Sequence, residues 1–530
     1  MTDPPWWRNA VIYQIYPRSF QDSDGDGVGD LAGIVRRLDH VAGLGVDAVA
    51  LAPVFPSPMA DTGYDVSDHR GIDPVFGSLS GFDALLDRAH GLGLKVVIDQ
   101  VLSRSSDKHP FFATSRASRD NPKADWYVWA EPKLDGTPPN NWQAVFGGPA
   151  WRWEPRRRQY YLANFRPSQP ALNFHHPAVR DWVLDTLCFW LDRGVDGFRL
   201  DSWNFTFHDV QLRDNPAESR SVPWPAGQPF QMQHQLFQKN QPEALAFSET
   251  VRAMLDGYPG ERALVAEINE FHHPVARLAE YIAPGRLHMG FHPGFLGPTF
   301  TPAFVRDQIR TFRDAAPGAC ACWAFSNHDV DRHLTRWAGH AIDDDRFAIL
   351  CAALLLSLEG TVSLYQGEEL GLRSAVLTRE ELRDPDGLGH WPQGAGRDGA
   401  RTPMPWEAHA PHAGFTEGTP WLPVKPPEAA RAVDTQAGVP GSVLERYRRL
   451  IALRRDLPAL RHGATRVLAA PAPILVLGRG EDVLCVFNLG PKPAAAPLPD
   501  GDWTPRDGTV AGAQAGRIAL DGNGWAILSR

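Results

Sequence analysis

The chain has 530 residues, of which 43% are hydrophobic and 22% are charged, and its formal net charge is −9 at pH 7. This composition excludes a globally disordered protein, and the mild acidic excess is not typical of a nucleic-acid-binding protein. No run approaches the roughly 20 apolar residues that a membrane span needs. The N-terminal segment, MTDPPWWRNAVIYQIYPRSF, has neither a basic region nor a small-residue cleavage site. We therefore expect no signal peptide and a cytoplasmic protein.

Short apolar and β-branched runs predict eight strands, which cover residues 10–17, 46–53, 95–102, 195–202, 263–268, 286–291, 321–327 and 362–367. Helical periodicity lies between them, most clearly at 31–44, 80–92, 178–193 and 343–357. Strands that alternate with helices indicate parallel βαβ units. Eight such units predict an α/β fold of the (β/α)8 TIM-barrel type rather than an open sheet.

Two segments interrupt this alternation. About ninety residues rich in Trp, Pro, Asn and Arg separate the third and fourth predicted strands, which indicates a small inserted domain. Residues 373–440 are rich in Gly and Pro and predict a long loop with little structure, and a helix at 441–456 precedes short strands that continue to the end. The expected organisation is the first part of the barrel at 1–103, the inserted domain at 104–174, the second part of the barrel at 175–460, and a C-terminal antiparallel β domain at 461–530.

The cysteines, at positions 188, 320, 322, 351 and 485, are few, odd in number and scattered, so a disulfide framework is not expected. Cys320 and Cys322 would point to one face of a strand, and we interpret them as small buried hydrophobes rather than as a metal-binding pair. Three consecutive arginines, 156–158, are interpreted as a solvated turn of the inserted domain rather than as an anion site.

Charged residues stand at the C-terminal ends of several predicted barrel strands, at the edge where barrel enzymes carry their active sites. The third strand ends with Asp99, the fourth with Arg199 and Asp201, and the fifth with Glu267, while His328 and Asp329 follow the seventh. Three of the carboxylates, those of residues 201, 267 and 329, are expected to converge at the mouth of the barrel.

Cleavage of a glycosidic bond needs two carboxyl groups in contrasting environments, one to attack the sugar and one to protonate the leaving oxygen. Arg199 beside Asp201 favours an ionised, nucleophilic carboxylate. Glu267 lies in an apolar strand, which should raise its pKa and suit it to general acid catalysis. Glu270 is a competing acid, but on an extended strand it would point to the opposite face, so Glu267 is preferred.

The chain resembles the α-amylase superfamily of glycoside hydrolases (glycoside hydrolase family 13), and within it the bacterial exo-acting α-glucosidases and oligo-1,6-glucosidases. The resemblance runs from residue 6 to the end of the chain and includes VIYQIYPRSF, DTGYDVSDH, GFRLD, FSNHDVDR, LYQGEELGL and GRDGARTPMPW. It implies that Asp201 is the nucleophile, Glu267 the acid/base, and Asp329 a stabiliser that holds sugar hydroxyls. It also implies the barrel, the inserted domain and the C-terminal β domain.

The resemblance further implies a set of substrate-binding residues around these carboxylates. Asp61 and Arg397 resemble an ion pair that closes the pocket behind a terminal glucose. The others are the stacking platform Tyr64, the pocket aromatics Phe146 and Phe165, and the polar residues Arg199 and His328.

The loop DSDGDGVGD, residues 22–30, places acidic residues at every second position with glycines between them. Such a loop folds oxygen atoms around a hard cation, but the position of the bidentate Glu of an EF-hand is Gly33, so the loop is not an EF-hand. It resembles the calcium site of the α-glucosidases, which implies a structural Ca²⁺, or Mg²⁺ in its place, bound by Asp22, Asp24, Asp26, the carbonyl of Val28, and Asp30. The alternative is an acidic surface loop without metal. No organic cofactor is expected.

The sequence departs from the family pattern near the expected pocket. The family run that ends in a sugar-binding His ends here in Ser103-Arg104, and Trp203 is bulkier than the usual aliphatic residue. The segment 169–173 lacks the usual acidic residue, and His69 replaces a tyrosine. Two interpretations of Arg104 remain open: it pairs with a nearby acid, or it meets an anionic group on carbon 6 of a sugar. In the second case, Trp203 and Arg104 could belong to one altered subsite.

The sequence therefore predicts a retaining, exo-acting α-glucosidase that releases terminal α-linked glucose from short oligosaccharides or glucosides through a covalent glycosyl-enzyme, with transglucosylation as a side activity. One alternative is an α-glycosidase for a 6-anionic sugar, a sulfoquinovoside or a glucoside 6-phosphate, whose anionic group Arg104 binds. The other is a sucrose or trehalose isomerase or transglucosidase. Oligo-1,6-glucosidases have valine directly after the nucleophile, so Ser202 here implies a preference for α-1,4 links. We expect a small carbohydrate substrate, no nucleic-acid or membrane partner, and a monomer or homodimer.

Overall fold

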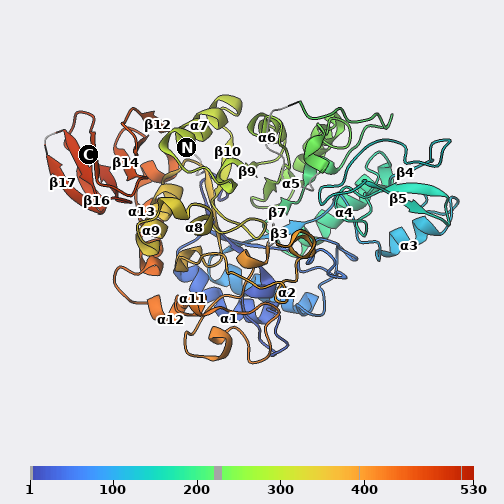
Figure 1. The fold of residues 1–530 in the computed structure, drawn as a ribbon, viewed down its shortest axis with the longest axis horizontal. Helices are drawn as coiled ribbons and strands as arrows, with labels where there is room; N and C mark the ends of the chain where they lie inside the picture. Colours follow the sequence, from blue (N-terminus) through green and yellow to red (C-terminus); the bar gives the residue numbers. More distant parts are fainter. Residues whose placement is uncertain (1–3, 220–228, 393, 395, 515) are drawn as a thin grey trace.

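The computed structural model describes residues 4–219, 229–392, 394, 396–514 and 516–530, and these fold around a closed barrel (Figure 1). Its eight strands in the described residues are β1 (Val11–Ile15), β2 (Ala48–Leu51), β3 (Lys95–Gln100), β7 (Gly197–Leu200), β8 (Ala263–Ala266), β9 (Met289–Phe291), β10 (Cys320–Ala324) and β11 (Thr361–Tyr365). Neighbouring strands pair in parallel, and β11 pairs with β1 to close the barrel. Each strand lies inside the predicted range or begins one residue before it, so the predicted barrel is confirmed.

The barrel strands are apolar because both of their faces are covered. All five residues of β1 are buried, as are all five of β10 and of β11. Parallel strands that helices cover on both faces have nearly continuous hydrophobic sequences.

Helices alternate with these strands, as the periodicity predicts. They are α1 (Leu31–Gly43), α2 (Leu79–Gly91), α4 (Pro177–Asp192), α5 (Pro242–Asp256), α6 (Pro274–Tyr281), α7 (Pro302–Ala315), α8 (His333–Arg336), α9 (Asp344–Ser357) and α13 (Val443–Asp456). Several begin at a side chain that accepts a hydrogen bond from a free backbone N–H, as Asp30 does from Gly33 and Ser78 from Gly81. The predicted helices agree with the observed ones to within two residues at each end.

Between β3 and β7 the chain leaves the barrel and forms α3 (Pro110–Ala117) and a small antiparallel sheet of β4 (Trp129–Ala130), β6 (Gln159–Leu162) and β5 (Trp151–Glu154). This part lies at one end of the molecule (Figure 1). Buried aromatic residues, among them Trp142 and Trp151, form its core. The structure thus contains the predicted insertion after the third barrel strand, while the boundaries 104 and 174 stay predictions.

The interpretation of residues 156–158 as a solvated turn is wrong for the middle arginine. Arg156 and Arg158 are exposed, but Arg157 is only 3% exposed. Its Nη1 donates to the carbonyl oxygens of Ser115, at 2.6 Å, and of Ala124, at 2.9 Å. Arg157 therefore satisfies buried backbone carbonyl groups near the end of α3, a role that a run of three like charges does not reveal.

The C-terminal part consists of two antiparallel sheets at the opposite end of the molecule (Figure 1). One has the order β12 (Thr465–Leu468), β13 (Ile474–Arg479), β14 (Val483–Asn488), β19 (Trp525–Ser529) and β16 (Thr504–Gly508). The other has the order β15 (Ala494–Pro497), β18 (Arg517–Leu520) and β17 (Val510–Gln514). Apolar side chains of both sheets share one core cluster, which explains how so small a region stays folded beside the barrel. The boundaries at 174/175 and 460/461 stay predictions.

Residues 373–440 contain only short helices within the part of the chain that the structure describes: α10 (Pro385–His390), α11 (Pro426–Ala429), α12 (Val433–Gln436) and single 3-10 turns. This long connection carries several charged residues to the mouth of the barrel, where they matter for the site.

All five cysteines are free. Cys320 and Cys322 are buried in one apolar cluster with Val265 and Met289, which agrees with their interpretation as small hydrophobes. Among the described residues, no helix combines the length and the apolar character needed to cross a bilayer.

Candidate active site

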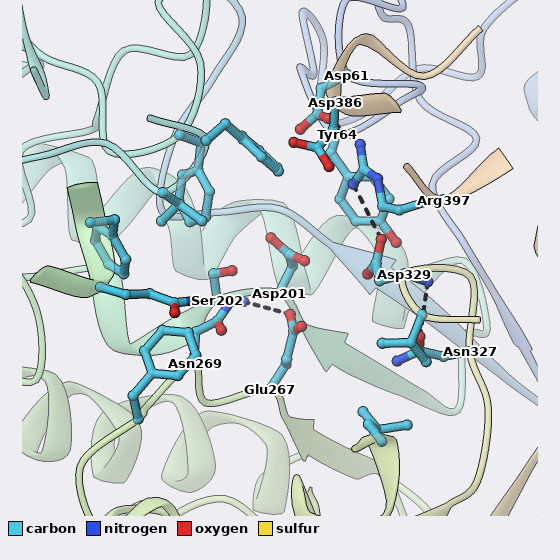
Figure 2. Close-up of a pocket in the computed structure, with 18 of the residues that line it drawn as sticks. Asp61, Tyr64, Asp201, Ser202, Glu267, Asn269, Asn327, Asp329, Asp386 and Arg397 are labelled. Atoms are coloured by element: carbon cyan, nitrogen blue, oxygen red, sulfur yellow. Dashed lines mark hydrogen bonds and ion pairs between the residues drawn. The ribbon is translucent and has the colours of Figure 1, made fainter. Parts of the chain in front are cut away.

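A pocket of about 360 Å³ opens where the barrel strands end (Figure 2). It collects side chains from distant parts of the chain, because every strand of a parallel barrel ends at the same rim. Nine of the predicted site residues line it: Asp61, Tyr64, Arg104, Phe146, Phe165, Asp201, Glu267, Asp329 and Arg397. Arg199 and His328 do not line the pocket but contact residues that do.

The first feature of the site is a pair of carboxyl groups bridged by one guanidinium. Arg199, on β7, places Nη1 3.2 Å from Asp201 Oδ1 and Nη2 3.0 Å from Glu267 Oε2. Arg199 also pairs with Asp99, at the end of β3. Asp201 and Glu267 follow adjacent strands, β7 and β8, and they lie next to each other in Figure 2. The pair that the sequence separates by 66 positions is therefore assembled by strand order.

The pKa values of the two carboxyl groups are shifted in opposite directions. Burial acts to raise the pKa of Asp201, but the charges of Arg104 and Arg199 outweigh it and hold the pKa below its usual value. Burial raises the pKa of Glu267 to about 8, and the neighbouring charges of Asp201 and Asp329 add to this rise. Near pH 7, Asp201 is therefore ionised while Glu267 retains its proton.

The backbone just after Asp201 helps to position Glu267. Ser202 adopts a left-handed conformation with φ 44°, and its N–H donates to Glu267 Oε2 at 3.1 Å. The next residue, Trp203, turns away from the pocket: it is fully buried, stacks on Phe247, and donates from Nε1 to Ser248. The idea that Trp203 shares an altered subsite with Arg104 is therefore wrong, because its indole packs in the barrel core.

Asp329 faces the carboxyl pair from across the pocket and is held by two arginines and a histidine (Figure 2). Its Oδ1 lies 3.2 Å from Arg397 Nη1 and 2.9 Å from Arg401 Nη2, and its Oδ2 lies 3.2 Å from His328 Nε2. Burial would raise the pKa of Asp329, but His328, Arg397 and Arg401 outweigh it and the pKa lies well below its ordinary value. The side chain is 31% exposed toward the pocket, so a fixed negative charge faces the ligand space.

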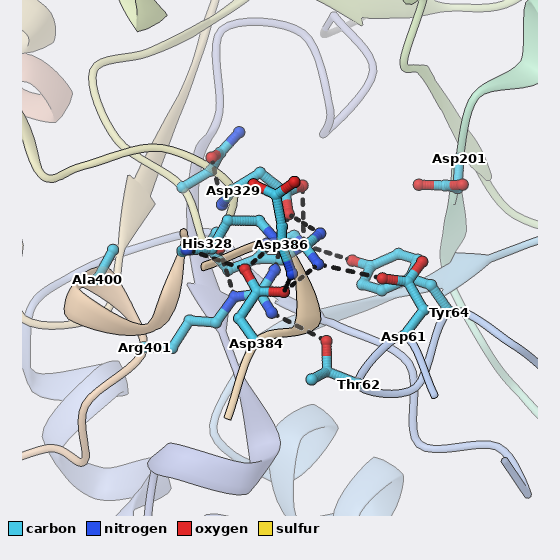
Figure 3. A network of polar contacts seen from close by, with 12 residues as sticks. Asp61, Thr62, Tyr64, Asp201, His328, Asp329, Asp384, Asp386, Ala400 and Arg401 are labelled. Carbon is cyan, nitrogen blue, oxygen red and sulfur yellow. Dashed lines mark hydrogen bonds and ion pairs between the residues drawn. The ribbon is translucent and has the colours of Figure 1, made fainter. Parts of the chain in front are cut away.

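A second ion-pair network closes the inner side of the pocket (Figure 3). Arg397 Nη2 lies 3.1 Å from Asp61 Oδ1, so the structure forms the pair that the resemblance implies. Asp384 clamps the same guanidinium, with contacts of 2.9 Å to Nε and 3.0 Å to Nη2. Arg166 Nε lies 3.3 Å from Asp61 Oδ1 on the other side. The result is a rigid wall of alternating charges.

Tyr64 lines the pocket beside this wall, and the buried His328 packs against it. Tyr64 Oη donates to Asp99 Oδ2 at 2.9 Å and lies 2.6 Å from His328 Nε2. The imidazole is stacked between the rings of Tyr16 and Tyr64. Burial lowers the pKa of His328 to about 3, so the ring is neutral near pH 7.

Aromatic side chains line another part of the pocket. The predicted rings Phe146 and Phe165 lie 6.5 Å apart, between centroids, and Phe230 and Phe271 line the same space. The pocket therefore combines apolar rings with charged groups.

Arg104 reaches into the centre of the site and pairs with the carboxylate of Asp201. Its Nη1 lies 2.9 Å from Asp201 Oδ2, and its guanidinium stacks on Phe165, 3.8 Å from the ring centroid. The side chain is only 4% exposed. Of the two interpretations of Arg104, the pairing with a nearby acid agrees with the structure, and the 6-anionic sugar is not favoured.

Sequence reasoning missed at least four charged residues of the site: Arg166, Asp384, Arg401 and the pocket-lining Asp386. Arg401 could have been predicted from the sequence, because it lies four positions after Arg397 in the motif GRDGARTPMPW. Asp384 and Arg166 come from irregular segments, where no periodicity indicates the direction of a side chain. Glu270 is not part of the pocket lining, and Asn240 Nδ2 and two backbone N–H groups donate to its carboxylate.

The acidic loop lies apart from the pocket residues, at the start of α1. Carboxylate oxygens of Asp22, Asp24 and Asp30 lie within 4.8 Å of one another, and this donor set fits a hard cation such as Ca²⁺. Asp26, which was predicted as a ligand, is not in this group; its Oδ1 accepts a hydrogen bond from the N–H of Val28. The loop also holds residues 415–421 against the barrel, through the hydrogen bond of Trp421 N to the carbonyl of Gly27.

Comparison with known proteins agrees with this geometry. The family model described as "Alpha amylase, catalytic domain" matches residues 14–463. A probable alpha-glucosidase of Rhizobium meliloti (strain 1021) is 51% identical over 515 residues, which cover 96% of this chain and 93% of that protein. An oligo-1,6-glucosidase of Heyndrickxia coagulans is 35% identical, with 94% of each chain covered. The crystal structure of an alpha-glucosyl transfer enzyme superposes with a TM-score of 0.96 at 51% identity over 100% of both chains. The chain therefore belongs to the α-amylase family of glycoside hydrolases.

Proposed function

We propose that the protein is a retaining, exo-acting α-glucosidase that releases terminal α-linked glucose from short oligosaccharides or glucosides. The observation that carries this proposal is the carboxyl pair of Asp201 and Glu267, which share Arg199 yet have opposite proton affinities. One guanidinium contacts both carboxyl groups, at 3.2 Å and 3.0 Å, so the two groups lie close together. Such closeness is typical of retaining enzymes, since inverting enzymes leave room for a water molecule.

In the proposed first step, Asp201 attacks C1 of the glucosyl unit while Glu267 donates its proton to the glycosidic oxygen. The bond from C1 to that oxygen breaks, and a glucosyl ester on Asp201 forms. In the second step, Glu267 takes a proton from water, the water oxygen bonds to C1, and Asp201 leaves as a carboxylate. An alcohol that takes the place of water is glucosylated instead, which makes transglucosylation a side activity.

The inner wall supports exo-action. Asp61, Arg397 and Asp384 close the pocket on the side of Asp329, opposite the carboxyl pair, with a network of fixed charges (Figure 2). Asp329, held ionised by Arg397 and Arg401, is a suitable acceptor for hydroxyl groups of the sugar. We infer that a chain can enter only by its terminal glucose.

The test of this function is hydrolysis of p-nitrophenyl α-glucoside and of maltose, followed by NMR of the first anomer released. Retention predicts α-glucose before mutarotation, and β-glucose as the first product would contradict it. Sucrose and trehalose in the same assay distinguish hydrolysis from isomerisation. We expect α-sulfoquinovosides and glucoside 6-phosphates to remain intact, since Arg104 is already paired.

We predict a preference for α-1,4 over α-1,6 links. Ser202 lines the pocket directly after Asp201, at the position where the oligo-1,6-glucosidases carry valine. Ser202→Val should shift the ratio of kcat/KM for maltose and isomaltose toward isomaltose by about 10-fold, a size typical of one apolar contact.

Ser202→Thr is the matched control for this shift. Position 202 has a positive φ, so both β-branched residues impose the same backbone strain, but threonine keeps the hydroxyl. An equal shift in both variants would mean that backbone strain, and not the side chain, sets the preference. A wild-type enzyme that prefers isomaltose would refute the prediction.

We also propose that the acidic loop binds a structural Ca²⁺. A ligand that binds only the folded state raises the melting temperature by mass action. Addition of EDTA should therefore lower Tm by several degrees, and Ca²⁺ should restore it, while initial rates at low temperature persist.

Two variants localise this effect. Asp24→Asn alters the cluster of Asp22, Asp24 and Asp30 and should abolish the response of Tm to Ca²⁺. Asp39→Asn is the control, since Asp39 is an exposed carboxylate of α1 that lies outside the loop and pairs with Arg88, and it should respond as the wild type does. A wild-type Tm that is unchanged by EDTA would show that the loop holds no metal.

The free cysteines support the proposal of a cytoplasmic enzyme, because reduced thiols persist in that compartment. The oligomeric state is proposed as monomer or homodimer, which size-exclusion chromatography with light scattering tests.

A further inference from the structure

We propose that Arg104 is a positioning residue that controls the lifetime of the glycosyl-enzyme: its ion pair favours Asp201 as a free carboxylate over Asp201 as a glucosyl ester. This rests on the proposed role of Asp201 as the nucleophile. The consequence is that Arg104 slows formation of the ester and accelerates its hydrolysis.

The geometry puts Arg104 on the oxygen of Asp201 that Arg199 leaves unoccupied. Arg199 Nη1 lies 3.2 Å from Oδ1, whereas Arg104 Nη1 lies 2.9 Å from Oδ2. Both partners are buried, with side chains that are 4% and 7% exposed for Arg104 and Asp201. Within the described residues, Oδ2 accepts no hydrogen bond, so the charge of Arg104 is the main influence on that oxygen.

Arg104 itself is held in place independently of its partner. Its guanidinium stacks on Phe165, its Nη1 donates to Ser103 Oγ at 3.3 Å, and its backbone forms a bridge with Ala171 in the inserted region. The cation therefore stays beside Asp201 in whichever chemical state Asp201 is.

The two arginines differ in what remains to them when Asp201 becomes an ester. Arg199 keeps Asp99 and Glu267 as carboxylate partners. In the described part of the chain, Asp201 is the one carboxylate paired with Arg104. A buried cation that loses its only counter-ion is costly, so the free energy of the ester rises relative to that of the free carboxylate.

The free energy of the enzyme therefore rises when the ester forms in the first step, and this rise is relieved when the ester is hydrolysed in the second step. When Asp201 bonds to C1 and the leaving oxygen takes the proton of Glu267, the negative charge at Asp201 is neutralised and Arg104 is left unpaired. When water bonds to C1 and gives its proton to Glu267, the electron pair of the C1–O bond returns to Asp201. Arg104 is then attracted to the developing carboxylate, an interaction stronger in the transition state than in the ester.

The experiment measures the lifetime of the trapped intermediate in wild type, Arg104→Met and Arg104→Lys. Each protein is glucosylated with 5-fluoro-α-glucosyl fluoride, freed of excess reagent, and followed for the return of activity. Arg104→Met should lose its 5-fluoroglucosyl group about 10-fold more slowly than wild type, the ratio that corresponds to one pKa unit of differential interaction. It should form the intermediate at least as fast, and Arg104→Lys should lie between the two.

Arg116→Met is the matched control. Arg116 also places its guanidinium over a phenylalanine, Phe112, and also pairs with a carboxylate, that of Glu154 at 2.7 Å, but none of these residues lines the pocket. Its loss should leave KM and the decay of the intermediate as in wild type. An equal slowing in both variants would mean that any loosening of the inserted region lengthens the lifetime, and would overturn the proposal.

The pH profile of kcat/KM is a second readout, which a merely structural role would not move. Arg199, Glu267 and Asp329 also face Asp201, and Arg104 is the neighbouring charge that most lowers its pKa. Arg104→Met should therefore shift the acid limb to higher pH, and Arg104→Lys should restore it.

The possible outcomes separate this inference from the proposed function. Unchanged decay in a folded Arg104→Met, or faster decay, contradicts the role of Arg104 even if Asp201 carries the sugar. An adduct on a residue other than Asp201 in the wild type contradicts the proposed function itself. If Arg104→Met melts before assay, the decay of the intermediate in Arg104→Lys decides, and a decay as fast as in wild type would overturn the proposal.

Discussion

Replacing Asp201 with alanine is expected to lower kcat for glucoside hydrolysis by about 10⁴-fold or more, as loss of a nucleophile does in other covalent mechanisms. The reason is that no glucosyl ester can form, so even substrates with excellent leaving groups are not rescued. The variant should fold, because Asp201 follows β7 and its loss opens no apolar cavity. Steady-state kinetics on p-nitrophenyl α-glucoside and circular dichroism measure the two quantities.

Azide is the control for this loss. A small anion can occupy the space left by the carboxylate and attack C1, and the product should be the β-glucosyl azide, with inverted configuration. Substantial turnover by Asp201→Ala without azide would end the assignment of Asp201 as nucleophile.

Replacing Glu267 with glutamine is expected to slow hydrolysis of maltose by about 10²- to 10⁴-fold, the usual contribution of a general acid. The effect on glucosylation by p-nitrophenyl α-glucoside should be much smaller, since a nitrophenolate leaves without a proton. An equal loss on both substrates in the glucosylation step would contradict the acid role.

The pH dependence tests the same group. The wild-type enzyme needs a proton on Glu267, whose pKa burial raises to about 8, so kcat/KM for maltose should fall as the pH rises through that value. Glutamine does not titrate, so the alkaline limb should disappear in Glu267→Gln. An alkaline limb that persists in the variant would assign it to another group.

Most of the barrel could be predicted from the sequence, because its strands are apolar runs between amphipathic helices. β10 and β11 begin one residue before their predicted ranges, since Cys320 and Thr361 are compatible with both a strand and a turn. The carboxylates of the site could be predicted for a related reason. All strands of the barrel end at the same rim, so a charged residue directly after an apolar strand lies at that rim.

What the sequence could not show are contacts between irregular segments. Asp384 clamps Arg397 and Arg157 caps buried carbonyl groups, and both depend on loop paths that no periodicity specifies. The orientation of Trp203 was also misjudged, because bulk at a position near the site does not tell which way the side chain turns. Arg104 was recognised as unusual, but its partner, the nucleophile itself, required the fold.

The most direct test is peptide mapping by mass spectrometry after reaction with 5-fluoro-α-glucosyl fluoride. The proposed mechanism predicts one added fluoroglucosyl group per active site, on the peptide that contains Asp201, and protection of that residue by a competing glucoside. An adduct on Glu267 or Asp329, or an unmodified protein that releases β-glucose from an α-glucoside, would contradict it.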